Sequence, residues 1–248
     1  AEADTQGSGG FVAGVRVTGV LNYTMQQQWI TRNSVLGGGA SYFADPPRSV
    51  NFVYVGTTGT PVATTACTNA ATARVSPSPQ QLVVDTAPVS MEKPYITIDR
   101  EGKYQLVTPR AKRDSNGLQW SAADDFIDGF EKVFVASNST AVTDINAKLA
   151  QGLHVILCPG IYSLPEPIRI GRAGSDHQVL LGLGLATLIP LHGEAAVQIE
   201  DAAGVRVAGI LLQAGPITSK ALLTVGTSPS DGDAANPTLL ADVFARVG

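Results

Sequence analysis

Short apolar runs recur along the C-terminal half of the chain, with about ten residues from one run to the next. They occupy residues 179–183, 186–189, 196–199, 205–212, 221–225 and 241–247. Gly, Asn, Asp or Ser separates them, and these residue types are typical of turns. The pattern predicts many short strands and therefore an all-β fold.

Two all-β architectures consist of many short strands, a sandwich and a solenoid. Sandwich strands alternate apolar and polar residues, whereas the coils of a solenoid stack in parallel around a narrow interior filled by small apolar residues, with Gly at corners. Segments 180–185 and 205–210 combine small apolar residues with Gly. They favour the solenoid, so the fold class we predict is a parallel β-helix.

A single amphipathic helix is predicted over residues 139–152. Val142, Ile145 and Leu149 recur at helical spacing, Ser139-Thr140 can cap the N-terminus, and Gly152 stands where a left-handed residue is expected after the last turn. The open end of a solenoid exposes apolar side chains and unpaired backbone groups. We therefore expect this helix to close the start of a solenoid, ahead of its first coil.

The N-terminal half predicts a second set of strands, over residues 11–20, 25–33 and 50–55. Residues 57–92 are rich in Thr, Ala, Pro and Ser without a period, which indicates a linker along a surface. Segments 95–99 and 103–107 flank a Gly-containing turn and predict a β-hairpin. The predicted organisation is the C-terminal coils of a first β-helix in 1–60, a linker with a hairpin and a short helix in 61–138, and the cap and first coils of a second β-helix in 139–248.

Composition excludes some classes of partner. Of the 248 residues only 15% are charged, the net charge is −4, and Lys and Arg form no basic stripe, so nucleic acid is not an expected partner. No apolar stretch reaches the roughly 20 residues of a membrane span. No motif for binding a nucleotide cofactor is present in the sequence, and no cofactor is expected.

Two sequons and two cysteines bear on the cellular compartment. Asn22 and Asn138 begin Asn-x-Thr triplets, which are glycosylated in secreted eukaryotic proteins. Cys67 and Cys158 fit no zinc spacing. Three states stay open for them: a disulfide with each other, disulfides with cysteines outside this sequence, or free thiols. We expect a secreted, extracellular protein.

Residues 26–34, 91–95 and 160–190 resemble secreted microbial pectate-lyase-like proteins with a right-handed parallel β-helix. The order of a solenoid end, a linker, a helix and a new solenoid is similar to the tandem β-helices of glycoside hydrolase family 55, the exo-β-1,3-glucanases. The resemblance implies a polysaccharide partner and a carboxylic acid that protonates the leaving oxygen. It also implies a second solenoid that continues beyond Gly248, where the acid can lie.

Gln26, Gln28 and Arg32 are expected on one face of a strand, with Trp29 on the other. Amide side chains beside an indole suit sugar binding, because hydroxyl groups need donors and acceptors while the apolar face of a sugar stacks on an aromatic ring. These four residues are the predicted sugar contacts. The alternative is structural, with polar ladders along successive coils and Trp29 filling a corner.

Acidic residues are densest at Asp124, Asp125 and Asp128, followed by Glu131. Paired carboxylates carry out glycoside hydrolysis, so the three aspartates are weak catalytic candidates. The alternative, which we favour, is a helix whose first turn carries these acids because the helix dipole stabilises them there. His154, His177 and His192 are far apart in sequence, so no metal site is predicted.

The leading hypothesis is an extracellular glycoside hydrolase that acts on a β-glucan or another cell-wall polysaccharide. A non-catalytic polysaccharide-binding or structural surface protein is the first alternative, and a polysaccharide lyase is the second. The fold alone does not separate them. Because the last predicted strand has no cap, we expect another segment or another chain to cover the solenoid end after Gly248.

Overall fold

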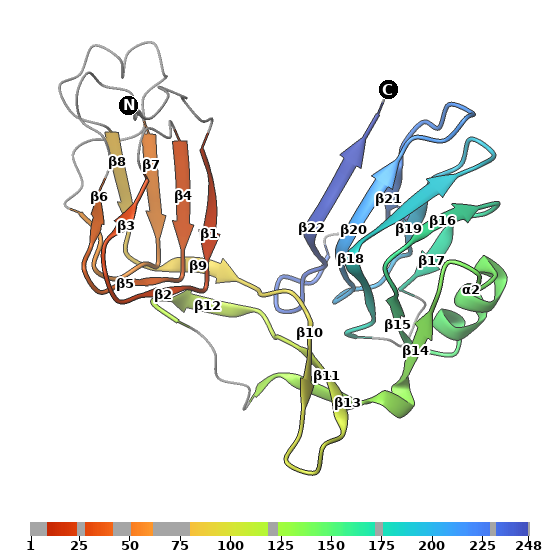
Figure 1. Ribbon diagram of the computed structural model, residues 1–248, viewed down its shortest axis with the longest axis horizontal. Helices are drawn as coiled ribbons and strands as arrows, with labels where there is room; N and C mark the ends of the chain where they lie inside the picture. The colour runs from red at the N-terminus through yellow and green to blue at the C-terminus, as the bar shows by residue number, and fades with distance from the viewer. Residues whose placement is uncertain are drawn as a thin grey trace, which may run out of the picture. The chain divides into compact units, whose positions relative to one another are not determined.

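The computed structural model describes residues 9–23, 28–41, 51–61, 80–118, 124–171, 176–228 and 232–247. Within these residues the protein consists of strands with one α-helix, which confirms the all-β prediction. The chain divides into two compact units (Figure 1). The first unit comprises Ala1–Ser90 and Lys112–Ser121, and the second comprises Met91–Ala111 and Ala122–Gly248. The predicted division at residues 60 and 138 stays a prediction.

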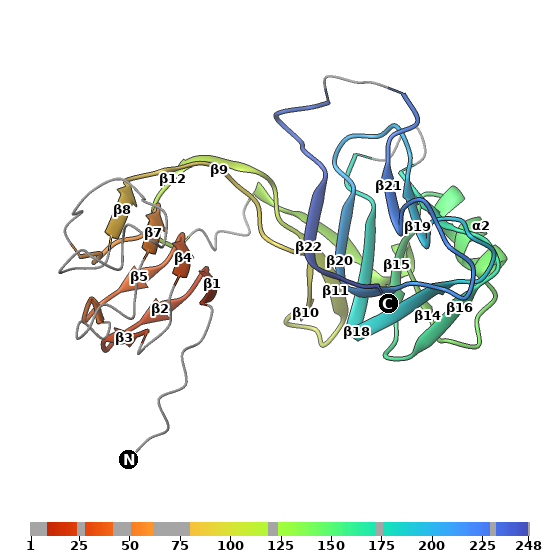
Figure 2. The same ribbon diagram turned by 90° about the horizontal axis from the view of Figure 1, so that it is seen from above.

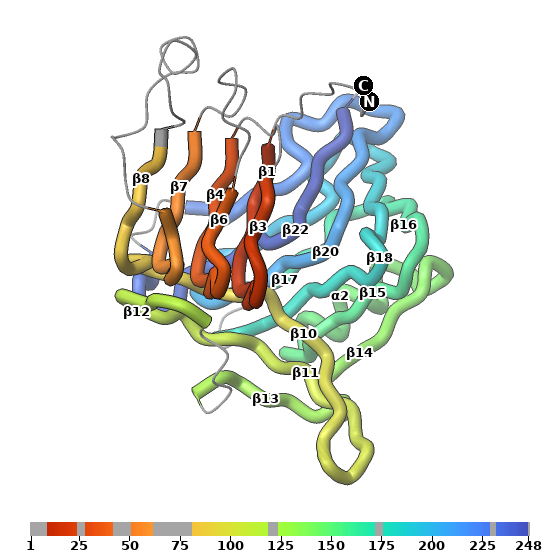
Figure 3. Tube along the Cα trace, turned by 60° about the vertical axis from the view of Figure 1, so that its left-hand side comes forward, coloured from red at the N-terminus to blue at the C-terminus, as the bar shows by residue number. Residues whose placement is uncertain are grey.

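The first unit is a stack of parallel strands. Its main sheet has the order β1 (Gly10–Ala13), β4 (Gln28–Arg32), β7 (Asn51–Val55) and β8 (Gln80–Val84). Short strands form two further parallel pairs, β2 (Arg16–Val17) with β5 (Val35–Leu36) and β3 (Leu21–Asn22) with β6 (Ala40–Ser41). The chain thus repeats one long and two short strands per turn, and its successive turns are visible in Figure 3.

Part of the predicted linker belongs to this unit, which corrects the expectation for residues 57–92. Strand β8 extends the parallel sheet, and β9 (Ala87–Ser90) pairs antiparallel with β12 (Lys112–Ser115). Among the described residues, the buried apolar cluster of the unit consists of Tyr23, Leu36, Phe52 and Tyr54. Their packing explains why these strands form: every second residue of β7 points inward.

The second unit contains the larger stack. Its main sheet has the order β14 (Val133–Ala136), β15 (His154–Leu157), β18 (Val179–Pro190), β20 (Arg206–Gln213) and β22 (Leu239–Arg246), and all neighbours are parallel. Strand β16 (Ile161–Leu164) also pairs with β18. A second parallel sheet contains β17 (Ile168–Ile170), β19 (Val197–Ile199) and β21 (Leu223–Val225). The predicted parallel stacking is confirmed, and Figure 2 shows β18, β20 and β22 side by side.

Helix α2 (Val142–Ala150) lies within the predicted range and contributes Val142, Ile145 and Leu149 to the core of this stack. Gly152 has a φ of +85°, as expected after the last turn. Two details differ from the prediction. The N-cap is Ala141, without a side-chain cap, because the Thr140 hydroxyl instead accepts the Ser137 N–H. Strand β14 precedes the helix, so the stack begins ahead of it.

A small antiparallel sheet packs on the outer face of the main sheet of the second unit. It has the order β10 (Tyr95–Ile98), β11 (Tyr104–Thr108) and β13 (Phe126–Gly129), and β10 and β11 form the predicted hairpin. A 3-10 turn, η2 (Phe130–Lys132), follows. Ile96 and Leu106 of this sheet pack against Ile156 and Leu181 of the stack. The favoured helix over the acidic cluster is therefore wrong, because Asp128 lies in a strand.

Within the described part of the chain, no helix has the length and apolarity that a membrane crossing requires. At the far edge of the main sheet, β22 exposes Leu240 and Phe244. The segment or chain that was expected to cover this end stays a prediction.

Candidate functional site

Asp128, His154 and His177 form a cluster in the second unit, with the first two buried and His177 half-buried. Asp128 is on β13, His154 begins β15, and His177 lies just ahead of β18. The Asp128 Oδ2 atom is 3.2 Å from His154 Nε2 and 2.9 Å from His177 Nε2. Its Oδ1 atom accepts a hydrogen bond of 2.7 Å from Lys132 Nζ. The Asp128 carboxylate therefore joins the hairpin sheet to the stack through two histidines, and Lys132 of η2 is its third partner.

The hydrogen bonds of this cluster fix where its protons lie. The Val179 N–H donates to His154 Nδ1 over 3.2 Å, so the proton of the neutral ring is on Nε2 and is donated to Asp128. The Nδ1 atom of His177 lies 2.5 Å from Asp176 Oδ1. A metal ion bound by the three residues would need a lone pair on the Nε2 atom of His154. The observed bonding instead gives a hydrogen-bonded network.

The electrostatics of the cluster argue against acid catalysis by Asp128. Burial raises the pKa of Asp128, but hydrogen bonds from Lys132 and His177 outweigh it, and the net pKa lies below the usual value. Burial lowers the pKa of His154, so that ring is neutral. A glycosidic acid needs a raised pKa and access to the sugar. Asp128 is ionised and only 4% exposed, so it has neither property.

The other two aspartates of the predicted group do not join this network. Asp124 is exposed, and Asp125 Oδ1 accepts the N–H of Arg110 over 3.1 Å. Next to them, the Arg110 guanidinium lies 3.8 Å from the centre of the Phe126 ring, which stacks on His177 at 3.9 Å. These contacts orient His177 toward Asp128 and support a structural role for the cluster.

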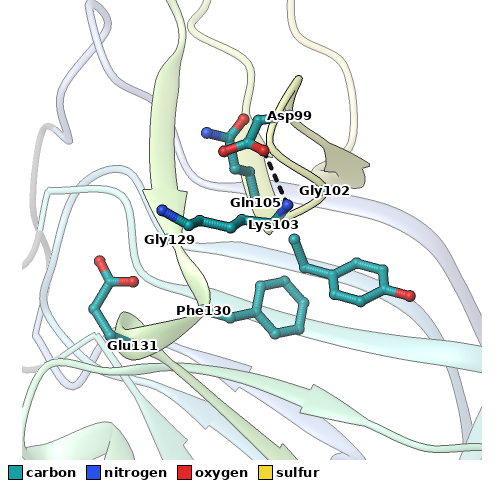
Figure 4. Close-up of a pocket in the computed structure, with 8 residues that line it drawn as sticks. Asp99, Gly102, Lys103, Gln105, Gly129, Phe130 and Glu131 are labelled. Carbon is teal, nitrogen blue, oxygen red and sulfur yellow. Dashed lines mark hydrogen bonds between the residues drawn. The ribbon is translucent and has the colours of Figure 1, made fainter.

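A shallow hollow with a volume of about 370 Å³ lies at the tip of the hairpin (Figure 4). Its lining residues are Asp99, Gly102, Lys103, Tyr104, Gln105, Gly129, Phe130 and Glu131. Asp99 Oδ1 accepts the N–H groups of Glu101 and Lys103, at 2.8 and 2.9 Å, and Gly102 has a φ of +82°. Local hydrogen bonds therefore stabilise the turn. The positive φ favours glycine at position 102.

Aromatic and charged groups meet at this hollow. The rings of Tyr104 and Phe130 are 5.6 Å apart at an angle of 44°. The Lys103 ammonium is 2.8 Å from a carboxylate oxygen of Glu101, and both side chains are exposed. Figure 4 shows the Lys103 side chain extending across the hollow toward Gly129. The combination of the exposed Tyr104 ring, the half-buried Phe130 ring and polar groups suits a ligand that has both apolar and hydroxyl-bearing faces.

The predicted sugar contacts lie in the first unit, and the three within the described residues are on both faces of β4. Gln26 lies outside the described residues. Gln28 is exposed and Arg32 half-buried, with Arg32 Nη1 donating to Asn33 Oδ1 over 2.9 Å. Trp29 points to the opposite face, where its ring lies 5.1 Å from that of Tyr23 in the core. A contact of these residues with sugar stays a prediction.

The predicted modification sites are only partly described. Asn22 and Asn138 are exposed, and their glycosylation stays a prediction. Cys158 is half-buried and is a free thiol in the described part of the chain. Cys67 lies outside the described residues, so the pairing of the two cysteines stays a prediction as well.

The sequence did not reveal the histidine cluster. Asp128 is 26 residues from His154 and 49 from His177. Their meeting depends on the parallel register that sets β15 beside β18 and on the hairpin sheet that covers both. A histidine at the start of a buried strand was the available signal, and it does not identify a partner.

Comparisons with known proteins show what the chain is similar to. Residues 133–248 match the LAM55 pectate lyase-like domain. An exo-β-1,3-glucanase from Streptomyces sp. SirexAA-E is 36% identical over 244 residues, which are 97% of this chain and 37% of that protein. The solved structure of sacteLam55A from the same organism has a TM-score of 0.81 at 34% identity, over 96% of this chain and 40% of the other.

A second solved structure, of a sacteLam55A variant in complex with glucose, has a TM-score of 0.79 at 33% identity, with the same coverage of 96% and 40%. The chain thus spans about two fifths of the length of these relatives. Residues 133–248 are thus similar to the LAM55 pectate lyase-like domain, and the resemblance of the chain to pectate-lyase-like proteins and exo-β-1,3-glucanases is confirmed.

Proposed function

We propose that this chain is part of a secreted glycoside hydrolase that removes glucose from β-1,3-glucan. The observation that carries the proposal is the similarity to an exo-β-1,3-glucanase, which extends over 97% of the chain at 36% identity and across both compact units. A similarity confined to one unit would suit a shared scaffold equally well. The observed sequence similarity includes both units and the segment that joins them in the sequence. It therefore favours a shared activity.

The proposed fold is a pair of right-handed parallel β-helices in tandem. Two observations support it: the main sheet of each unit stacks its strands in parallel, and the first unit has one long and two short strands in each of its first two turns. Such a repeat winds one chain into coils, and right-handed crossovers between parallel strands are strongly preferred. A solenoid gives a polysaccharide a long, rigid surface along its coils.

The catalytic acid is not Asp128 in this proposal, because the pKa of that group is lowered. Hydrolysis of a glycosidic bond needs one carboxyl group that donates a proton and a second carboxylate that activates water or attacks the sugar. We place the acid in sequence beyond Gly248, in agreement with the fact that the glucanase relative is longer than this chain.

The test is glucose release from laminarin by the purified protein, in the full length in which its gene encodes it. We expect glucose as the product, with α-1,3-glucan and pectin left intact. Binding of laminarin without any release of sugar would overturn the enzyme proposal in favour of a polysaccharide-binding protein. Unsaturated uronate products from pectin would instead indicate a lyase.

Secretion is a separate part of the proposal. It is supported by the exposure of Asn22 and Asn138, the first residues of both sequons. Expression through a eukaryotic secretory pathway, followed by mass measurement before and after enzymatic deglycosylation, tests it. We expect Asn138→Gln to remove one glycan, and an unmodified secreted protein would contradict the glycosylation prediction.

A further inference from the structure

We propose that the hollow at the tip of the β10–β11 hairpin binds a segment of neutral β-glucan, apart from the place of cleavage. The inference rests on the proposed function for the identity of the polysaccharide. Tyr104 is 56% exposed, and its ring meets Phe130 at 5.6 Å to form an apolar wall. The C–H face of a glucose residue stacks on such a ring, while its hydroxyl groups point to the sides.

Polar groups surround this aromatic wall. Asp99 and Lys103 come from the hairpin turn, Gln105 comes from β11, and Glu131 comes from η2 (Figure 4). Together they offer an ammonium, an amide and carboxylates, which supply the donors and acceptors that sugar hydroxyls require. Because Asp99 Oδ1 is fixed by two backbone N–H groups, the turn that carries these side chains is already ordered before a ligand arrives.

The charges of the hollow favour a neutral sugar over a polyuronate. The carboxylates of Asp99 and Glu131 line the hollow together with the Lys103 ammonium, and that ammonium already pairs with the Glu101 carboxylate beside the hollow. A chain of uronates would meet net negative charge here, whereas a glucan carries no charge to repel.

The hollow is suited to holding a chain and not to breaking it. Asp99 is engaged by its own turn, and the Glu131 carboxylate folds back over Gly129, where a Cβ atom would lie 2.2 Å from a carboxylate oxygen. The open rim leaves the reacting centre of a bound sugar in water. Such a site adds affinity for a long polysaccharide that also occupies the catalytic site, and adds none for a short one.

The experiment compares Tyr104→Ala with two controls. Tyr104→Phe keeps the ring, and Tyr95→Ala removes a ring that is 44% exposed on the opposite face of the same hairpin and does not line the hollow. Affinity electrophoresis of the full-length protein in gels containing laminarin measures binding to the polymer. Glucose release from laminaritriose measures the catalytic centre separately.

We expect Tyr104→Ala to weaken binding to laminarin by about two- to tenfold and to leave laminaritriose turnover unchanged. Tyr104→Phe and Tyr95→Ala should bind as the unsubstituted protein does, and polygalacturonate should not retard any of the four. Equal laminarin binding by Tyr104→Ala and the unsubstituted protein would overturn the binding site. An equal loss in Tyr95→Ala, or retardation by polygalacturonate that Tyr104→Ala abolishes, would overturn it too.

The two assays distinguish a failure of the binding site from a failure of the proposed function. If laminaritriose is hydrolysed while Tyr104→Ala binds laminarin normally, the protein is a glucanase and the hollow is not a glucan site. If no protein hydrolyses either substrate, the electrophoresis still reports whether the hollow binds laminarin. A loss of binding in Tyr104→Ala would then support the site in a non-catalytic protein.

Discussion

The two units stack their strands in the same way but fill their interiors differently. In the described part of the first unit the buried apolar cluster has four members, three of them aromatic, and Tyr23 contacts both Trp29 and Phe52 at 5.1 Å. The main core of the second unit has twenty members, nearly all aliphatic. A parallel stack can therefore be held by a few large rings or by many small side chains in register.

The difference decides how stability is distributed among residues. A large ring in a small core makes many of the available contacts, so its loss leaves a cavity that few neighbours can fill. In the aliphatic core, each side chain contributes a smaller share and has more neighbours. The ring core should therefore depend on single residues more than the aliphatic core does.

The largest expected effect is that of Phe52→Ala. Phe52 is fully buried among three other members of a four-residue cluster, so its removal should cost about 3–5 kcal/mol of the first unit's free energy of unfolding. Hydrogen exchange measured by mass spectrometry should show lost protection in β4 and β7, with protection in β18 and β20 retained.

The matched variant in the aliphatic core is Ile168→Ala, which should cost about 2–5 kcal/mol and reduce protection only in the second unit. Ile98→Ala, at a side chain that is 56% exposed, is the control and should change little. The comparison would fail if Phe52→Ala reduced protection in both units, or if Ile168→Ala proved clearly the more damaging of the two.

A second prediction concerns how closely the coils of the second unit approach. Gly182 and Gly209 face each other across β18 and β20, and a Cβ atom on Gly209 would lie 2.3 Å from the Gly182 carbonyl oxygen. Gly209 also has a φ of +68°. Gly209→Ala should therefore cost about 2–4 kcal/mol by thermal or denaturant unfolding, since it combines a clash with a strained backbone.

Gly102→Ala separates these two causes. Gly102 has a φ of +82° but no atom within 4 Å of its Cβ position, so only the backbone penalty of about 1–2 kcal/mol applies. If Gly209→Ala costs no more than Gly102→Ala, the close approach of the two coils is not a source of stability.

Acid should destabilise the second unit through the histidine cluster. The pKa of Asp128 is lowered in the folded protein, and so is that of His154. Between the folded and unfolded pKa values the unfolded chain binds more protons, so stability rises with pH there. As pH falls, the contribution of His154 to the free energy of unfolding is lost below its unfolded pKa of about 6.5. The contribution of Asp128 is lost below its unfolded pKa of about 3.8.

In the first unit, burial raises the pKa of Tyr23. The contribution of Tyr23 to the free energy of unfolding therefore falls only as pH rises above about 10. Hydrogen exchange at pH 7, 5 and 3, corrected for intrinsic rates, should therefore show the second unit losing protection first. Asp128→Asn should reduce the loss of protection below pH 4. It should not change the loss of protection above pH 5, because that loss is due to His154. An acid response that is identical in the variant would exclude Asp128 as its source.

The parallel stacks and the helix were predictable because they follow from local patterns. The apolar runs from Val179 onward mark strands, small residues and Gly favour parallel coils, and Val142, Ile145 and Leu149 mark one face of a helix. Strand β8 was missed because it follows a long stretch of Thr, Ala, Pro and Ser that itself has no strand period.

The acidic segment was misread for a different reason. Acids after a Ser are favoured in a first helical turn, but the same residues also suit a strand whose Asp128 carboxylate is hydrogen-bonded to residues far along the chain. Those partners, His154 and His177, reach Asp128 only through tertiary packing. The hollow depends in the same way on η2 lying beside β11, which the sequence does not specify.

The smallest expected effect is that of Trp29→Phe, and it tests the aromatic core most finely. The Trp29 Nε1 atom is buried and has no hydrogen-bond partner among the described residues, and such a donor carries an uncompensated desolvation cost. Phenylalanine keeps an aromatic ring against Tyr23 but is smaller than tryptophan, so a gain from removing the donor opposes a loss of packing. We expect a net change within about 1 kcal/mol by denaturant unfolding of the first unit.

Trp29→Ala, which loses the ring as well, should cost about 3 kcal/mol or more. A comparable loss in Trp29→Phe would show that the indole N–H has a partner or that the larger ring is essential, and the ring core would then be as finely packed as the aliphatic one.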